Sequence, residues 1–150
     1  MSVLLTSERL RLAMMVVVFL LVNAFVGCGA KDETNEARLL IDRLEGLDSD
    51  DLQDRRRRVD ALLAMPLEGE RVRATHEVCA PMHDAMVSAE EATAELRAMV
   101  QAAEAGDSEA AARADAAADA SAEALDRVQE LRPQCEAQLT ELRTRYSPRR

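Results

Sequence analysis

Aromatic residues, glycine and proline are scarce in this sequence, and each scarcity narrows the range of folds. There is no Trp, one Tyr and two Phe, and both Phe residues, Phe19 and Phe25, lie near the N-terminus. A core built downstream of them must therefore consist of Leu, Val, Met and Ala. These residues, together with many Glu and Arg, lose little rotamer freedom in helices. The composition predicts an all-α fold.

Positive charge is also in deficit, with 19 Lys and Arg against 28 Asp and Glu and a formal net charge of −9. Loss of an N-terminal leader that contains Arg9, Arg11 and Glu8 would bring the charge of the remaining chain to −10. We therefore expect no nucleic acid partner, and an acidic surface disfavours electrostatic binding to anionic lipids. A length of 150 residues leaves room for one domain.

Motifs for catalysis and for cofactors are lacking as well. The chain has no Gly-rich phosphate loop, no zinc-protease helix motif, and no Ser with a His and an acid in a recognisable arrangement. Its many carboxylates are spread around helical surfaces, where they usually serve solubility. We expect a protein that is not an enzyme.

The N-terminal segment has the anatomy of an export signal. Arg9 and Arg11 precede an apolar run over residues 12–26 in which Asn23 is the one polar residue. A charged region, about 15 apolar residues and small residues at the cut site are typical of a secretory signal. The run is short for a permanent membrane span, which needs about 20 apolar residues. We expect residues 1–27 to be removed.

The residues Phe25-Val26-Gly27-Cys28 resemble the lipobox of bacterial lipoproteins, although Phe25 stands where Leu is usual. The resemblance implies that Cys28 is acylated through its sulfur and becomes the first residue of a lipoprotein anchored in the cell envelope. Gly29, directly after the cysteine, is similar to the outer-membrane class, so we expect an outer-membrane anchor facing the periplasm. The covalent lipid is then the only attached group, and no cofactor is expected.

Four segments are expected: a signal peptide (1–27), a lipidated Cys with a short tether (28–33), a helical domain (34–146) and a C-terminal tail (147–150). The murein lipoprotein is similar in being short, Ala-rich and heptad-bearing, but it joins peptidoglycan through a C-terminal Lys. Here the tail reads Ser147-Pro148-Arg149-Arg150, and the one Lys is Lys31. We therefore expect no covalent peptidoglycan link of that type.

Two short helices are expected before residue 66. Apolar residues recur at helical spacing in each: Ala37, Leu40, Leu44 and Leu47 in the first, and Leu52, Val59, Leu62 and Leu63 in the second. Gly46 is a candidate left-handed stop for the first helix. Asp48 and Ser49 can cap the second helix, which Met65-Pro66 should end.

The longest pattern is a pair of heptad seams. The first contains Val72, Thr75, Cys79, Met82, Met86, Ala89, Thr93, Leu96, Val100 and Ala103, and the second contains Ala111, Ala114, Ala118, Ser121, Leu125, Val128, Cys135, Leu139, Leu142 and Tyr146. Between them, Gly106-Asp107-Ser108 supplies a stop and new capping groups. If the seams fold back there, facing residues have numbers that sum to about 214. We expect a long antiparallel helical hairpin that forms a three- to four-helix bundle with the two short helices.

The same register places Cys79 opposite Cys135 and Pro81 opposite Pro133. Both helices should bend or restart at the prolines. In an exported chain the two cysteines are most simply a structural disulfide. Cys28 then carries the lipid, and no thiol is left over.

A metal site is the alternative for this region, because His76, Cys79, Met82, His83 and Met86 lie within three turns. Soft Met and Cys ligands together with imidazole would suit copper or zinc. However, His76 and His83 are about 10 Å apart along a helix, too far to share one ion. Met82 and Met86 also fall on the seam, where Met commonly fills core space. We therefore expect no metal.

The run Arg55-Arg56-Arg57-Arg58 is the strongest concentration of positive charge. Asp51 precedes Arg55 by four residues and Asp54 precedes Arg58 by four, the favourable orientation for ion pairs on a helix. We expect a solvated face. The alternative is a docking patch for an acidic partner or a lipid headgroup.

These patterns predict a lipid-anchored, non-catalytic structural or protein-interaction module of a Gram-negative cell envelope, with another envelope protein as its partner. The alternative is a periplasmic helical-hairpin sensor of metal or stress that uses the cluster from His76 to Met86. An accessory subunit of an enzyme would differ from the first function only in its partner. The heptad seams also leave open a dimer in place of the intramolecular hairpin.

Overall fold

The computed structural model describes residues 29–146 of the chain. Four helices follow one another: α2 (Gly29–Glu45), α3 (Leu52–Leu63), α4 (Glu70–Glu104) and α5 (Ser108–Tyr146). No strand occurs among the described residues, so the predicted all-α fold is confirmed. None of the helices in this part of the chain has an apolar stretch that would span a membrane. The expected signal peptide, Cys28 and the tail 147–150 lie outside the described residues.

α2 differs from the predicted first helix at both ends. It begins at Gly29, inside the segment that we expected to be a tether before Thr34. It ends at Glu45, but Gly46 does not take the left-handed conformation expected of it. Among residues 29–146, Gly106 alone has a positive φ.

α3 is capped by Asp51 rather than by Asp48 or Ser49. The Asp51 carboxylate accepts hydrogen bonds from the backbone N–H groups of the second and third following residues at 2.8 and 3.0 Å. A carboxylate at this position satisfies two unpaired donors and faces the positive end of the helix dipole. The helix ends at Leu63, just before Met65-Pro66.

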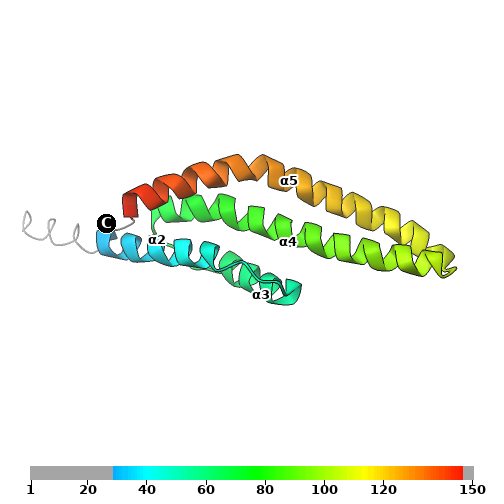
Figure 1. Cartoon of the computed structure of the whole chain (residues 1–150). Coiled ribbons are helices and arrows are strands. Elements are labelled where there is room, and N and C mark those ends of the chain that lie inside the picture. Colours follow the sequence, from blue (N-terminus) through cyan, green and yellow to red (C-terminus); the bar gives the residue numbers. More distant parts are fainter. Residues whose placement is uncertain (1–28, 147–150) are drawn as a thin grey trace, which may run out of the picture.

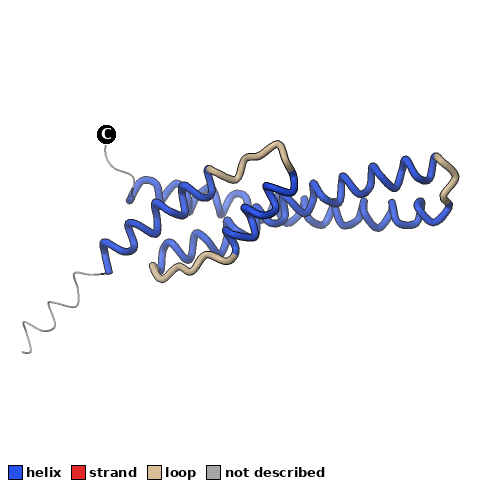
Figure 2. The backbone as a smooth tube through the Cα atoms, turned by 90° about the horizontal axis from the view of Figure 1, so that it is seen from below, coloured by secondary structure: helices blue, strands red, loops and turns tan. Residues whose placement is uncertain are grey.

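α4 and α5 lie side by side and antiparallel (Figures 1 and 2). At 1.5 Å per residue, their 35 and 39 residues give lengths of about 52 and 58 Å. The chain reverses at Gly106, whose φ of 100° lies in the region that favours glycine. The backbone N–H of Asp107 donates to the Ala102 carbonyl (3.1 Å), and its side chain accepts from the N–H groups of Glu109 and Ala110. One residue therefore helps to end α4 and to begin α5.

Two contacts fix the register of this hairpin. Cys79 and Cys135 form a disulfide, and Thr93 Oγ1 lies 3.1 Å from Ser121 Oγ. Both pairs have residue numbers that sum to 214, in agreement with the predicted register.

The two prolines do not interrupt the helices. Pro81 lies inside α4 and Pro133 inside α5. Of the two outcomes that we expected at the prolines, a bend or a restart, the restart does not occur in either helix. Figure 1 shows that α5 is bent along its length. A proline in a helix removes one backbone donor and favours such bending.

The seam of α5 is displaced by one residue near the turn. Ala110 and Ala117 are buried, whereas the predicted Ala111 and Ala118 are exposed. A straight helix drifts by about 20° per heptad from a strict 3.5-residue repeat. The predicted and observed seams agree again at Ser121, which is buried.

Three large apolar residues that the patterns placed in the interior are partly exposed: Leu63 (41%), Val100 (43%) and Leu125 (50%). Val100 and Leu125 lie closer to the turn than any residue that α4 or α5 contributes to the main core, which reaches Val87 on α4 and Cys135 on α5. A seam between two helices is sheltered from one side only, so its flanking residues stay in contact with water.

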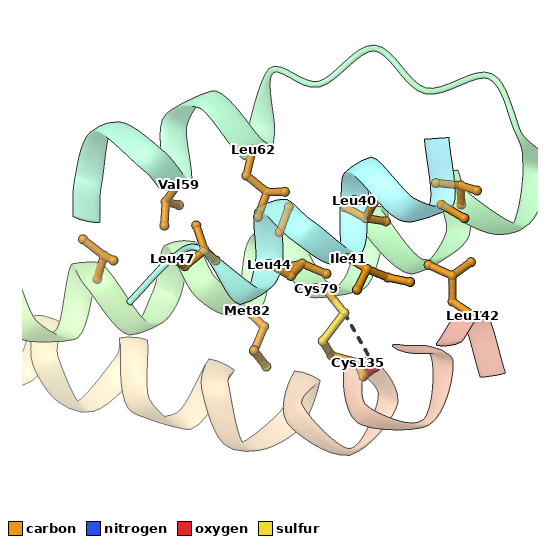
Figure 3. Packing of buried hydrophobic residues seen from close by; sticks show 14 residues of the cluster. Leu40, Ile41, Leu44, Leu47, Val59, Leu62, Cys79, Met82, Cys135 and Leu142 are labelled. Carbon is orange, nitrogen blue, oxygen red and sulfur yellow. Dashed lines mark hydrogen bonds between the residues drawn. A yellow bond between two sulfur atoms is a disulfide. The ribbon is translucent and has the colours of Figure 1, made fainter. Parts of the chain in front are cut away.

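The main hydrophobic core lies at the open end of the hairpin, where α2 and α3 cover α4 and α5 (Figure 3). Its fully buried large side chains include Leu40 of α2, Val59 and Leu62 of α3, and Val72 and Val87 of α4. The core residues of α4 all precede residue 88, and those of α5 all follow residue 134. The half of the hairpin near the turn therefore has no share in this core.

Candidate functional site

Arg56 connects α3 to α4 through a set of hydrogen bonds. Its guanidinium donates to Glu91 at 2.7 and 3.0 Å, to Asp84 at 2.6 Å and to the Ser88 hydroxyl at 3.1 Å. The side chain is only 21% exposed. The hydrogen bonds that Arg56 donates, first to Glu91 and then to Asp84, raise the pKa of Arg56 above its usual value, against the opposing effect of burial. This arginine is a structural clamp and not part of a solvated face.

Arg55 makes a second connection between the same helices. It pairs with Glu90 of α4, and its Nε donates to the Ser49 carbonyl at 3.0 Å. The ion pair with Asp51 that the sequence predicts is replaced, because the Asp51 carboxylate caps α3. Arg55 thus ties both the loop before α3 and α3 itself to α4.

Arg57 and Arg58 lie on the outer side of α3. Arg58 forms the predicted ion pair with Asp54 (2.7 Å) and donates to the Gly46 carbonyl at 2.6 Å. Hydrogen bonds from Arg57 and then Arg58 hold the pKa of Asp54 below its usual range. Of the four arginines, only Arg57 keeps a largely exposed side chain, at 72%. The run therefore offers little unpaired charge to a docking partner.

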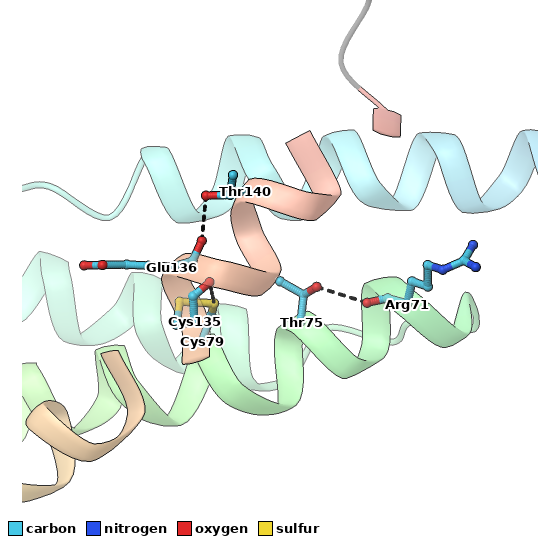
Figure 4. Close-up of a disulfide and its surroundings, with 6 residues drawn as sticks. All are labelled: Arg71, Thr75, Cys79, Cys135, Glu136 and Thr140. Carbon is cyan, nitrogen blue, oxygen red and sulfur yellow. Dashed lines mark hydrogen bonds between the residues drawn. A yellow bond between two sulfur atoms is a disulfide. The ribbon is translucent and has the colours of Figure 1, made fainter. Parts of the chain in front are cut away.

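The sulfur atoms of Cys79 and Cys135 are bonded to each other at a buried position between α4 and α5. Figure 4 shows the disulfide beside Thr75, whose hydroxyl donates to the Arg71 carbonyl at 3.0 Å. The disulfide links the two helices inside the main core, so it stabilises the same region that α2 and α3 cover.

The residues of the alternative metal site are held in other contacts. His76 Nε2 donates to the Leu62 carbonyl at the end of α3 (2.7 Å), the Cys79 sulfur is in the disulfide, and Met82 is buried in the core. Within the described part of the chain, no group of three His, Cys, Asp or Glu side chains is placed to hold a metal ion. The structure therefore does not bring the cluster together as a ligand set.

His83 lines a groove of about 330 Å³ where all four helices meet. The groove is also lined by apolar side chains of Leu44, Leu47, Val59, Met86, Val87 and Leu139, and by charged side chains of Glu45, Asp48, Arg55, Glu90 and Arg143. Burial lowers the pKa of His83, and Asp48 opposes this effect. Two ion pairs, Glu45 with Arg143 (2.7 Å) and Arg55 with Glu90, already engage the charges beside the imidazole. Among the side chains that line this groove, no nucleophile lies beside a base, as nucleophilic catalysis would require.

The half of the hairpin near the turn, residues 92–126, projects beyond α2 and α3 (Figures 1 and 2) and is called the arm. It carries eight acidic side chains, all exposed: Glu95, Glu104, Asp107, Glu109, Asp115, Asp119, Glu123 and Asp126. Against these stand two basic side chains, Arg97 and Arg113, so the arm has a net charge of −6. The other described residues also sum to −6, but over more than twice the length.

A second groove, of about 410 Å³, lies at the base of the arm. It is lined by Leu52, Met86, Ala89, Glu90, Thr93, Ala94, Arg97, Leu125, Val128 and Arg132. Leu52 is the first residue of α3. The groove therefore opens where the cover provided by α3 ends, and Leu125, half exposed, contributes to its wall.

Sequence patterns did not single out the arm as a surface. One signal in the sequence could have done so: Asp115, Asp119, Glu123 and Asp126 follow one another at steps of four, four and three residues. This spacing places four like charges on one face of α5, which destabilises an isolated helix slightly. By contrast, the partners of Arg55 and Arg56 lie on another helix and leave no local signal.

No protein-family model, curated protein or solved structure matches the chain. Its own fold and charge distribution are therefore the features that bear on its function.

Proposed function

We propose that the chain is a lipid-anchored lipoprotein of a bacterial cell envelope and acts as a non-catalytic interaction module. A lipid on Cys28 holds the bundle at the membrane, and the arm is presented to another envelope protein. The observation that carries this proposal is the separation between the start of α2 and the turn at Gly106, which lie at opposite ends of the molecule (Figure 1).

The geometry of the chain favours this orientation. Consecutive Cα atoms are about 3.8 Å apart, so an acyl group on Cys28 attaches next to Gly29, the first residue of α2. α4 runs from that end for about 52 Å before the turn. An anchor at Cys28 would therefore keep the open end near the lipid and direct the arm away from it.

The uneven covering of the hairpin supports an interaction role for the arm. The open end is closed by α2 and α3, by the disulfide and by the clamps of Arg55 and Arg56. The arm has none of these and leaves Val100 and Leu125 partly exposed. A rigid base with an uncovered extension is suited to holding a binding surface at a fixed distance from the membrane.

The anchoring part of the proposal is tested by the intact mass of the protein extracted from its native membranes, with alkylation before reduction. We expect a chain that begins at Cys28, carries acyl mass and has no alkylatable thiol. The matched variant Cys28→Ser should stay uncleaved and unacylated. An unacylated wild-type chain would overturn the lipoprotein proposal. Two alkylatable thiols on an acylated chain would instead remove the disulfide between Cys79 and Cys135 and make metal titration the next experiment.

The interaction part is tested by a photoreactive amino acid placed at Leu125 or, as the control, at Leu63. Both side chains are about equally exposed (50% and 41%), but only Leu125 lies on the arm. In native membranes we expect a discrete cross-linked product of defined mass from Leu125 and none from Leu63. Equal labelling from the two positions would contradict a docking role for the arm.

A further inference from the structure

We propose that the arm binds a basic amphipathic helix of another protein, which lies along the hairpin in line with α3. This inference rests on the proposed function, because it takes the arm as the docking element and names the chemistry of its partner. Three observations carry it: the way in which α3 covers the hairpin, the groove where α3 stops, and the charge of the arm.

The chain itself shows how this hairpin is covered by a third helix. α3 is amphipathic and basic, with Val59 and Leu62 buried and with two arginines, Arg55 and Arg56, that pair with α4. Their acceptors on α4 are Asp84, Glu90 and Glu91. Burial of apolar side chains and arginine–carboxylate pairs thus act together to hold α3 against α4.

The apolar surface of the hairpin continues beyond Leu52, the first residue of α3. The groove at the base of the arm is lined by Leu52 of α3 together with Ala94 and Leu125 of the arm. Beyond it, Val100 is 43% exposed. Val100 follows Thr93 by seven residues and Arg97 by three, so it falls on the face of α4 that lines the groove. Half-exposed apolar residues on this face offer a surface for the apolar stripe of a helix.

The negative charge of the arm favours a basic binding partner. All eight acidic side chains of the arm are exposed, and within residues 29–146 only Asp107 among them has an ion pair, with Arg113 at 3.3 Å. A second copy of the chain would bring two arms of net charge −6 together, which like-charge repulsion disfavours. An acidic or neutral helix would leave the arm's carboxylates unpaired.

The partner must also have an apolar face. Arg97 and Arg132 line the groove, so a purely polybasic segment would meet like charge there and would leave Leu125 uncovered. An amphipathic helix can place apolar residues in the groove while its basic residues pair with exposed carboxylates elsewhere on the arm. The arm is therefore suited to a helix of the same kind as α3 and not to a basic tail.

The test uses the full acylated protein in detergent and two synthetic peptides of about 18 residues, long enough to form a helix. Both carry the same Leu stripe, with Arg on the polar face of one and Glu on that of the other. Binding is measured by fluorescence anisotropy. We expect the Leu/Arg peptide to bind and the Leu/Glu peptide not to bind.

The variant Val100→Gln/Leu125→Gln keeps every charge of the arm and replaces its two exposed large apolar side chains. We expect it to bind the Leu/Arg peptide about tenfold more weakly, because two partly exposed apolar side chains are lost. The matched control Leu39→Gln/Leu63→Gln alters apolar residues of α2 and α3 with exposures of 48% and 41%. It should bind as the wild type does.

Four results would overturn the inference. Binding of the Leu/Glu peptide with equal affinity would remove the charge selection, and unchanged binding by Val100→Gln/Leu125→Gln would reduce the effect to charge alone. Self-association of the wild type in sedimentation, lost in that variant, would identify a second copy as the occupant. Acylation of Cys28 is measured separately, from the intact mass of the chain. An acylated chain that fails to bind the Leu/Arg peptide would therefore contradict the inference without contradicting the lipid anchor.

Discussion

The hydroxyl oxygens of Thr93 and Ser121 lie 3.1 Å apart across the hairpin, 14 residues beyond Cys79 on α4 and 14 residues before Cys135 on α5. Ser121 is buried, and its hydroxyl is also within 3.4 Å of the Ala89 carbonyl. Because buried hydroxyls need partners, this pair fixes the register of α4 and α5 at a second level.

A disulfide engineered at the positions of Thr93 and Ser121 should form spontaneously. In a chain with Cys79→Ala and Cys135→Ala, the added pair Thr93→Cys/Ser121→Cys should oxidise to an intrachain disulfide, because the two side chains already face each other. The control pair Thr93→Cys/Ala122→Cys places the second cysteine at an exposed residue and should stay reduced. Mass shifts after alkylation distinguish the two, and equal oxidation would contradict the register.

Loss of the native disulfide should cost a large part of the stability. Closing a loop of this size, with a sequence separation of 56 residues, is worth about 4 kcal/mol in the chain-entropy model. We expect the variant Cys79→Ala/Cys135→Ala to unfold at a lower guanidinium concentration with the same helical circular dichroism before the transition. A change below about 1 kcal/mol would show that core packing alone holds the hairpin.

Much of this fold could be predicted because it depends on local spacing. The heptads from Val72 onward determined which helix faces meet, and a turn at Gly106 then set the register that joins Cys79 to Cys135. The prediction was wrong where packing is weak: alanines at the arm tolerate a shift of one residue, so Ala110 is buried in place of Ala111.

Contacts between distant segments could not be predicted in this way. Asp51 stood at the right distance to pair with Arg55, but its carboxylate caps α3, and Arg55 pairs with Glu90 instead. In the same way Glu36 of α2 accepts hydrogen bonds from the backbone N–H groups before α4, at 2.8 Å from that of Gly69. Which partner a charged side chain finds depends on the tertiary arrangement, and the spacing of residues along one helix carries no information about that arrangement.

The clamp between α3 and α4 predicts a contrast between neighbouring arginines. Arg56→Ala should destabilise the protein by about 1–2 kcal/mol, because charge-assisted hydrogen bonds to Asp84 and Glu91 are lost at a mostly covered site. Arg57→Ala, at a side chain 72% exposed, should change stability by less than about 0.5 kcal/mol. Urea unfolding measures both, and hydrogen exchange should rise within α3 only for Arg56→Ala. Equal effects would mean that the clamp adds nothing beyond surface charge.

A stabilising substitution is predicted at Gln138. Its Oε1 is buried with no hydrogen-bond partner within the described residues. An unsatisfied buried polar group costs about 1–3 kcal/mol, so Gln138→Leu should raise the free energy of unfolding by about 1 kcal/mol. The control Gln134→Leu, at an exposed residue of the same helix, should leave it nearly unchanged. A loss of stability in Gln138→Leu would show that the amide is satisfied by water.

The stability of the protein should decrease as the pH falls below about 6.5 because of His83. Burial lowers the pKa of His83 in the folded chain, with Asp48 in partial opposition, whereas an unfolded His has a pKa of about 6.5. The unfolded state therefore binds the proton more readily. The contribution of neutral His83 is complete above about pH 6.5 and is lost as the pH falls from there to the folded pKa.

The variant His83→Gln cannot take up this proton and should show a flatter dependence of stability on pH in that window. Urea unfolding at several pH values measures the slope for both proteins. The ion pairs around the imidazole, such as Glu45 with Arg143, are common to the two, so their titration cancels in the comparison. Parallel slopes would mean that the groove opens to water and that protonated His83 is tolerated there without loss of packing.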